Sequence, residues 1–152
     1  MIKLCIIGAG SSVFTKNIVT DILLTKELKD IEFSLMDISE ERLKTSNEIV
    51  SQISKKLGVS VNIISTTNRK EALKNSSFVL TSFQVGGYEP STVLDFKIPK
   101  KYGLDQTIAD TIGIGGIMRG LRTMPILNSI AQDILEICPN AILLQYVNPM
   151  CM

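Results

Sequence analysis

Short apolar runs alternate with longer amphipathic segments over the first half of the chain. The apolar runs predict strands at residues 3–7, 33–36, 60–65 and 78–83. The segments between them carry apolar residues at helical spacing and predict helices at residues 12–25, 42–57 and 68–74. Strands that alternate with helices are typical of a parallel sheet with helices packed on its faces.

The alternation stops at residues 84–116, which hold six of the ten glycines and predict a long irregular connection. A connection of this kind, after a central strand of such a sheet, is a usual place for substrate and cofactor contacts. An amphipathic helix is expected at 117–137, where Pro125 predicts a kink or a break. A fifth strand is expected at 141–147. The predicted fold class is α/β, a Rossmann-like doubly wound parallel sheet that forms one domain over residues 1–152.

The first strand leads directly into a glycine turn, Gly8-Ala9-Gly10-Ser11-Ser12, at the start of a helix. Such a turn lets backbone N–H groups and the helix N-terminus approach a pyrophosphate. Asp37 ends the second strand, where a carboxylate accepts from ribose hydroxyls and disfavours the 2′-phosphate of NADP. Gly8, Gly10 and Asp37 are therefore candidate NAD-binding residues, although a glycine pair alone also fits a simple tight turn. Val13 replaces the third glycine of the G-x-G-x-x-G pattern, which is expected to affect helix seating more than phosphate contact.

Composition narrows the possible partners and compartments. A net charge of +1 gives no electrostatic argument for nucleic acid or an anionic membrane. No apolar run resembles a membrane span or signal peptide. Three unclustered cysteines favour reduced thiols and a cytoplasmic location. The chain has no histidine, so it supplies no imidazole as a general base or metal ligand.

Three segments together resemble one known family. They are IIGAGSSVFTKN (6–17), the long stretch QVGGYEPSTVLDFKIPKKYGLDQTIADTIGIGGIMRGLRT (84–123) and YVNPMCM (146–152). They are similar to the N-terminal cofactor domain of the NAD- and manganese-dependent family 4 glycoside hydrolases, and ADTIGIGG is nearest to the α-galactosidase (melibiase) branch. One departure is Cys151, where the family has alanine, and we expect it to be a small core residue.

The resemblance implies an unusual hydrolysis of small glycosides, outside the usual two-carboxylate scheme. NAD takes a hydride from C3 of the sugar, a base removes the C2 proton, and the aglycone leaves by elimination. Water then adds and the hydride returns. Mn2+ holds the O2 and O3 oxygens and polarises the transient ketone. The family also implies a homo-oligomer for the full-length protein.

The resemblance also carries roles for single residues. Gly8, Gly10, Ser11 and Asp37 match the family's cofactor positions. Asn148 matches an asparagine at the sugar hydroxyls, although Asn-Pro is also common in turns. Asp110 is expected to position the substrate or donate a proton to the leaving oxygen, with an Asx-turn residue as the equal alternative. Gln84 is expected to line the cofactor cleft. Arg119 and Arg122 are expected to be solvated surface residues, with one of them facing the active site as the alternative.

The family's metal ligands, a cysteine and a histidine, and its tyrosine base match no position in this chain. We therefore expect a domain truncated before the substrate and metal domain, inactive as a glycosidase alone but able to bind NAD. Two alternatives remain. A malate- or lactate-type 2-hydroxy-acid dehydrogenase has similar architecture, but it needs an arginine in the mobile loop and residues 84–116 contain none. A stand-alone, non-enzymatic NAD-binding module also fits the missing histidine.

Overall fold

The computed structural model describes residues 2–28, 30–107 and 111–152. The chain divides into two compact units. The first unit comprises Met1–Phe83 and Asp133–Gln145, and the second comprises Gln84–Gln132 and Tyr146–Met152. Each unit is described by itself.

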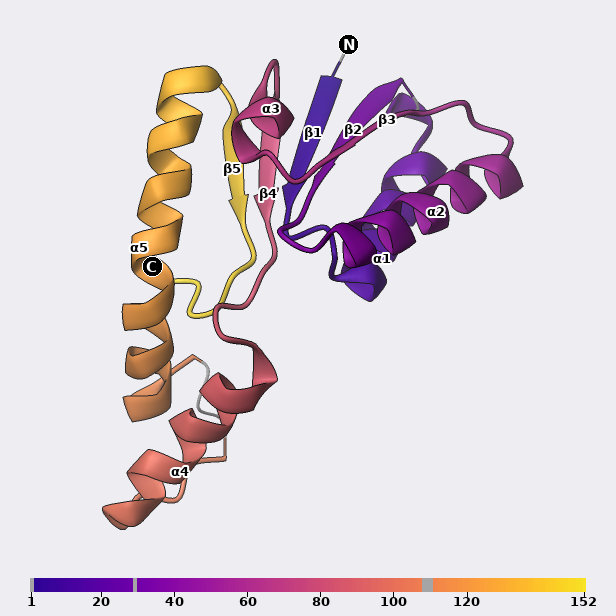
Figure 1. The fold of residues 1–152 in the computed structure, drawn as a ribbon. Helices are drawn as coiled ribbons and strands as arrows, with labels where there is room; N and C mark the ends of the chain where they lie inside the picture. The colour runs from indigo at the N-terminus through magenta and orange to yellow at the C-terminus, as the bar shows by residue number, and fades with distance from the viewer. Residues whose placement is uncertain (1, 29, 108–110) are drawn as a thin grey trace. The chain divides into compact units, whose positions relative to one another are not determined.

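The first unit is built on a five-stranded sheet (Figure 1). Its strands are β1 (Ile2–Ile7), β2 (Ile31–Met36), β3 (Asn62–Thr66), β4 (Phe78–Thr81) and β5 (Ile142–Gln145). They lie in the order β3-β2-β1-β4-β5, and every neighbouring pair is parallel. The predicted doubly wound parallel α/β sheet is confirmed. Ile7 pairs with Met36, so the residues that follow β1 and β2 leave the sheet side by side.

Side-chain caps mark the starts of two helices of this unit, and a glycine marks the end of one. They are α1 (Ser12–Leu24), a single 3-10 turn η1 (Lys26–Leu28), α2 (Glu40–Leu57) and α3 (Arg69–Leu73). The Ser39 side chain accepts from the Arg42 amide and caps α2. Gly58 ends α2 in the left-handed conformation with φ 65°. The Asn68 side chain caps α3 in the same way as Ser39 caps α2.

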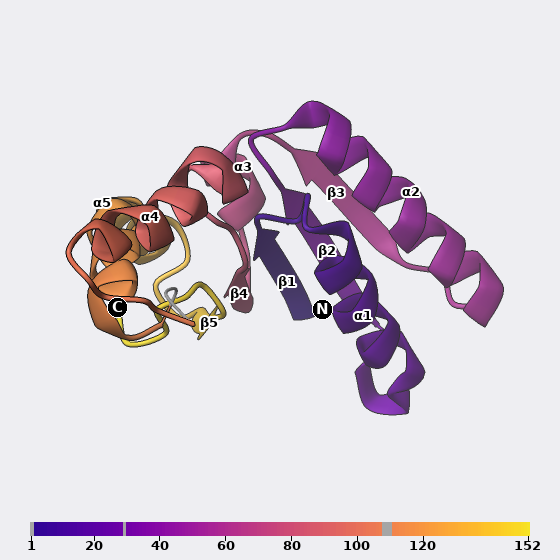
Figure 2. The same ribbon diagram turned by 90° about the horizontal axis from the view of Figure 1, so that it is seen from below.

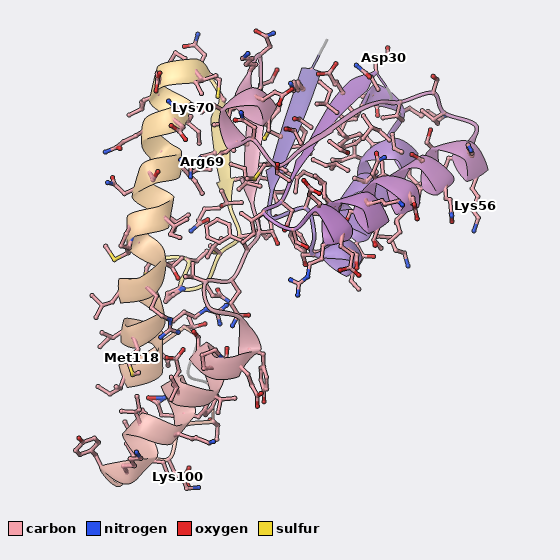
Figure 3. The ribbon with its side chains drawn as sticks, viewed as in Figure 1. Asp30, Lys56, Arg69, Lys70, Lys100 and Met118 are labelled. Atoms are coloured by element: carbon pink, nitrogen blue, oxygen red, sulfur yellow. The ribbon has the colours of Figure 1, made fainter. Side chains whose placement is uncertain are left out.

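Helices cover both faces of the sheet (Figure 2). On one face, α1 and α2 pack against the inward side chains of β1 and β2. The buried residues that these four elements contribute to the core are Leu4, Ile6, Val19, Leu23, Ile31, Phe33, Leu35, Leu43 and Val50. On the other face, the Ser34 hydroxyl of β2 donates to Ala72 O of α3 over 3.0 Å. Arg69 and Lys70, labelled in Figure 3, pair there with Asp133 near the end of the last helix.

The second unit contains helices where the sequence predicts an irregular connection. Residues Gly87–Thr92 form a wide-turn segment, η2, which is kinked at Glu89 with φ −107° and ψ 131°. The helix α4 (Val93–Lys101) follows it. The predicted long connection therefore contains a helix that the sequence did not indicate. The buried residues of α4 are Asp95 and Pro99, so the inward face of this helix has no apolar stripe for hydropathy to reveal.

The long helix α5 (Gly113–Ile137) begins four residues earlier than predicted and continues through Pro125. Of the kink or break predicted at Pro125, the break is therefore wrong. A proline in a helix interior costs about 3 kcal/mol, mainly through one lost hydrogen bond and a clash with the preceding turn. In a helix of 25 residues, the hydrogen bonds on both sides of Pro125 offset that cost.

Candidate cofactor-binding site

The turn between β1 and α1 requires its first glycine. Gly8 has φ +91°, and a β-carbon built on it would lie 2.1 Å from the Ser82 carbonyl oxygen. A side chain is excluded there by both the backbone conformation and the close approach of the neighbouring segment. The amides of Gly8 and Ala9 both donate to Met36 O, each over 2.9 Å. The turn is therefore tied to the end of β2.

Two buried hydroxyls fix the middle of the turn. The Ala9 carbonyl accepts from Thr15 Oγ1 of α1 over 2.9 Å and from Ser46 Oγ of α2 over 2.7 Å. Sequence analysis did not identify either hydroxyl. Ser46 carried a usable signal, because it lies between Leu43 and Val50 on the buried stripe of α2, where a polar side chain needs a partner.

Asp37 holds the second glycine in place. Its Oδ2 accepts from the Gly10 amide over 2.8 Å, and its Oδ1 accepts from the Ser39 amide over 2.9 Å. A β-carbon on Gly10 would lie 2.5 Å from that Oδ2, so the close contact depends on glycine. Each carboxylate oxygen keeps a further lone pair. The partly exposed carboxylate can therefore still accept from two vicinal hydroxyls.

The N-terminus of α1 offers an unused donor in the residues that follow the glycine turn. Among the residues that the structure describes, none accepts from the Val13 amide. Ser11 precedes the helix with no capping bond from its side chain, and the first turn of α1 carries no acidic residue. An unsatisfied N–H at a helix N-terminus favours an anion. Together with the lone pairs of Asp37, this arrangement fits a dinucleotide that has a pyrophosphate and a ribose with free 2′- and 3′-hydroxyls.

Val13 does not disturb the packing of α1. Its side chain is 71% exposed, whereas Thr15, Val19 and Leu23 supply the buried face of the helix. The expected effect of Val13 on helix seating is therefore wrong, because the side chain at this position points to solvent.

The other predicted site residues are not among those that contact the glycine turn or Asp37. Gln84 and Asn148 lie in the second unit. Gln84 is exposed, and its Nε2 donates to Gly87 O over 3.0 Å and to Thr92 Oγ1 over 2.6 Å, which ties it to the segment that follows. Asn148 is partly buried. Asp110 lies outside the described residues. The roles expected for these three residues remain predictions.

Arg122 is not a solvated surface residue. Its Nη1 and Nη2 donate to the two carboxylate oxygens of Asp95 over 2.8 and 2.6 Å. The Asp95 side chain is 3% exposed and the Arg122 side chain 28%. The pair joins α4 to α5 inside the second unit. The expectation for Arg122 is wrong because its partner lies in a segment whose helix was not predicted.

Cys151 is exposed, so the expectation of a small core residue is also wrong. Cys5, in contrast, is buried in β1 as expected.

Among the described residues, no group of three or more His, Cys, Asp or Glu side chains could hold a metal ion. These residues by themselves do not fit a manganese site. In the same part of the chain, no helix is both long and apolar enough to cross a membrane.

The sequence profile of the family described as "Family 4 glycosyl hydrolase" matches residues 3–152. The chain is 53% identical over 150 residues to an alpha-galactosidase of Bacillus subtilis (strain 168), covering 99% of this chain and 35% of that protein. It is 42% identical over 151 residues to an alpha-galactosidase of Rhizobium meliloti (strain 1021), covering 99% of this chain and 31% of that protein. The chain thus spans about a third of the length of these relatives.

Solved structures of similar fold include a member of the same group of glycosidases and a dehydrogenase. A 6-phospho-alpha-glucosidase from gut microorganisms, in complex with NAD and Mn2+, matches with a TM-score of 0.83 and 28% identity, covering 97% of this chain and 33% of that one. Malate dehydrogenase of Archaeoglobus fulgidus, in complex with NADH, matches with a TM-score of 0.67 and 20% identity over 97% of this chain and 41% of that one. The second likeness, at 20% identity, is one of fold alone. Because the family profile covers nearly the whole chain, the protein belongs to the family 4 glycosyl hydrolases.

Proposed function

We propose that this chain is the NAD-binding part of a longer NAD- and manganese-dependent glycosidase. The observation that carries the proposal is the cluster at the ends of β1 and β2. There the Asp37 carboxylate holds the Gly10 amide, and the unused Val13 amide lies at the start of α1. The solved 6-phospho-alpha-glucosidase relative, which binds NAD and Mn2+, supports the same cofactors for this protein.

Each residue of the cluster has a separate task in the proposal. The Val13 amide and the exposed Ser11 hydroxyl bind the pyrophosphate, while Asp37 accepts from the hydroxyls of the adenosine ribose. Gly8 and Gly10 keep side chains away from the turn. When bound, NAD+ supplies the acceptor for a hydride from C3 of the sugar and later returns it.

In the proposal, three residues outside the cluster contact the substrate or the cofactor. Asn148 binds sugar hydroxyls, and Gln84 lines the cofactor cleft. Asp110 positions the substrate or donates a proton to the leaving oxygen. The described residues offer no manganese ligand set, so the manganese ligands of the proposed enzyme lie outside them.

An α-galactoside is the substrate that the relatives favour. The two alpha-galactosidases are 53% and 42% identical to this chain, whereas a probable 6-phospho-beta-glucosidase of Bacillus subtilis is 39% identical. The proposal further places the full-length protein in the cytoplasm as a homo-oligomer that carries out C3 oxidation, elimination, water addition and re-reduction. The isolated chain is expected to bind NAD+ without hydrolysing glycosides.

Calorimetric titration of the purified chain with NAD+ tests the cofactor site. Asp37→Ala should weaken binding about tenfold or more, because hydrogen bonds to a charged group contribute about 1.5–3 kcal/mol. Asp21→Ala is the matched control, since Asp21 is an exposed acid on α1 away from the turn, and should leave the affinity within about twofold. Absence of NAD+ binding by the unmodified chain would contradict the proposal. Release of galactose from an α-galactoside by the isolated chain would contradict its expected inactivity.

A further inference from the structure

We infer that Arg42 faces the 2′-oxygen of the adenosine ribose and, with Asp37, sets the preference between NAD+ and NADP+. The inference rests on the proposed NAD+ site at the glycine turn. It assigns a second specificity residue, and with it a latent site for a 2′-phosphate. Asp37 excludes that phosphate by its charge, whereas the Arg42 guanidinium has the charge that attracts it.

The position of Arg42 brings it to the same point as Asp37. A β-carbon built on Gly10 would lie 2.5 Å from Asp37 Oδ2 and 2.8 Å from Arg42 Cβ. The Arg42 side chain therefore starts beside the contact between the carboxylate and the Gly10 amide. From there, its guanidinium has the length to reach a ribose substituent held by Asp37.

No other function in the described structure accounts for Arg42. The residue is exposed, and among the described residues it makes no ion pair. It occupies the third position of α2 after the Ser39 cap, where a Glu or Gln would complete a capping box. A cation in the first turn also opposes the helix dipole. Arg42 is thus unfavourable for the helix that carries it, which is consistent with a role in binding.

The opposing charges predict a clear pattern among variants. Asp37→Ser removes the repulsion and leaves room for a 2′-phosphate, so Arg42 becomes the group that binds it. We expect NADP+ affinity to rise about tenfold or more in this variant, while NAD+ affinity falls, because one charge-assisted hydrogen bond corresponds to about 10- to 100-fold. In the Asp37→Ser/Arg42→Gln variant, the gain in NADP+ affinity should disappear, with NAD+ affinity changed less than about twofold relative to Asp37→Ser.

Calorimetry with NAD+, NADP+ and adenosine 2′,5′-bisphosphate tests this pattern on the purified chain. Lys44→Gln in the Asp37→Ser background is the matched control, because Lys44 is another exposed cation in α2, and it should leave NADP+ affinity unchanged. Asp37→Asn, which keeps the shape of the side chain and removes its charge, repeats the comparison if Asp37→Ser does not fold. Equal NADP+ affinity with and without Arg42 in either background would overturn the inference while leaving the NAD+ site intact. If the unmodified chain binds no NAD+, the inference and the proposed function both fail.

Discussion

The thiol of Cys5 lies on β1 with none of its surface exposed, and this burial raises its pKa from 9.0 to about 12. A raised pKa means that the folded chain keeps the proton that the unfolded chain releases. The resulting stability is complete below pH 9 and is lost as the pH rises toward 12. The free energy of unfolding should therefore be about 1 kcal/mol smaller at pH 10 than at pH 8 from this group alone. Urea unfolding at the two pH values measures the difference.

Cys5→Ala isolates that contribution, because alanine removes the titrating group. The pH-dependent loss of stability should shrink by about 1 kcal/mol in this variant. Cys151→Ala, at an exposed cysteine, should leave the loss unchanged. An identical loss in Cys5→Ala and the unmodified chain would show that the thiol ionises as easily in the folded state as in the unfolded one.

Single residues of the cofactor cluster could be predicted, but their partners could not. Gly8, Gly10 and Asp37 stand out because a glycine turn and a strand-end acid are close in sequence to the strands that carry them. The bond from Ser46 to Ala9 joins residues 37 positions apart, and the sequence shows only a serine on an apolar stripe. Cys151 was wrongly placed in the core because size and polarity alone do not determine exposure at a loop.

Among the helices, the pair between Asp95 of α4 and Arg122 of α5 is expected to contribute strongly to stability. Arg122→Met leaves the Asp95 carboxylate buried without its partner, which typically costs about 3–5 kcal/mol. Lys100→Met is the control, because Lys100 pairs with Asp105 at 3.4 Å with both side chains exposed, and it should cost less than about 1 kcal/mol. Urea unfolding compares the two variants.

The double variant Asp95→Leu/Arg122→Met refines this prediction. Replacing both members of a buried ion pair with apolar residues is often close to neutral. Most of the stability lost in Arg122→Met should therefore return. If Arg122→Met destabilises no more than Lys100→Met, the second unit does not depend on this pair.

The elements differed in how well the sequence predicted them. The strands β1, β2 and β4 are predicted because both of their faces are buried, which produces short continuous apolar runs. The helix α4 is missed because its inward residues are an aspartate and a proline. The start of α5 is missed because its first turn contains three glycines, Gly113, Gly115 and Gly116, and glycine normally disfavours helix.

At the scale of the whole molecule, the sheet leaves an apolar edge uncovered. β5 has β4 as its neighbour on one side, and the other side is open in the described chain. Ile142, Leu143 and Leu144 are 57%, 44% and 37% exposed. Successive strand residues point to opposite faces, so neither face of β5 is well covered. An apolar edge strand of this kind predicts self-association of the isolated chain.

Leu143→Lys should reduce that association, because a charged residue on an edge strand opposes pairing with another strand. Sedimentation or light scattering over a range of protein concentrations measures the effect. Leu24→Lys, at an exposed leucine of α1, is the control and should not change the association. A chain that stays monomeric before any substitution would show that the exposed edge does not drive pairing.

The two hydroxyl groups on the Ala9 carbonyl also bear on how fast a cofactor could be captured. Fixing the backbone of one residue costs about 1–2 kcal/mol of conformational entropy. For the glycine turn, that cost is met when the chain folds, because Thr15, Ser46 and Met36 already hold its carbonyl and amides. An arriving dinucleotide therefore meets a turn that needs no reordering. Its rate of association should be limited by diffusion and orientation, and differences in affinity among cofactors should arise mainly from how long each remains bound.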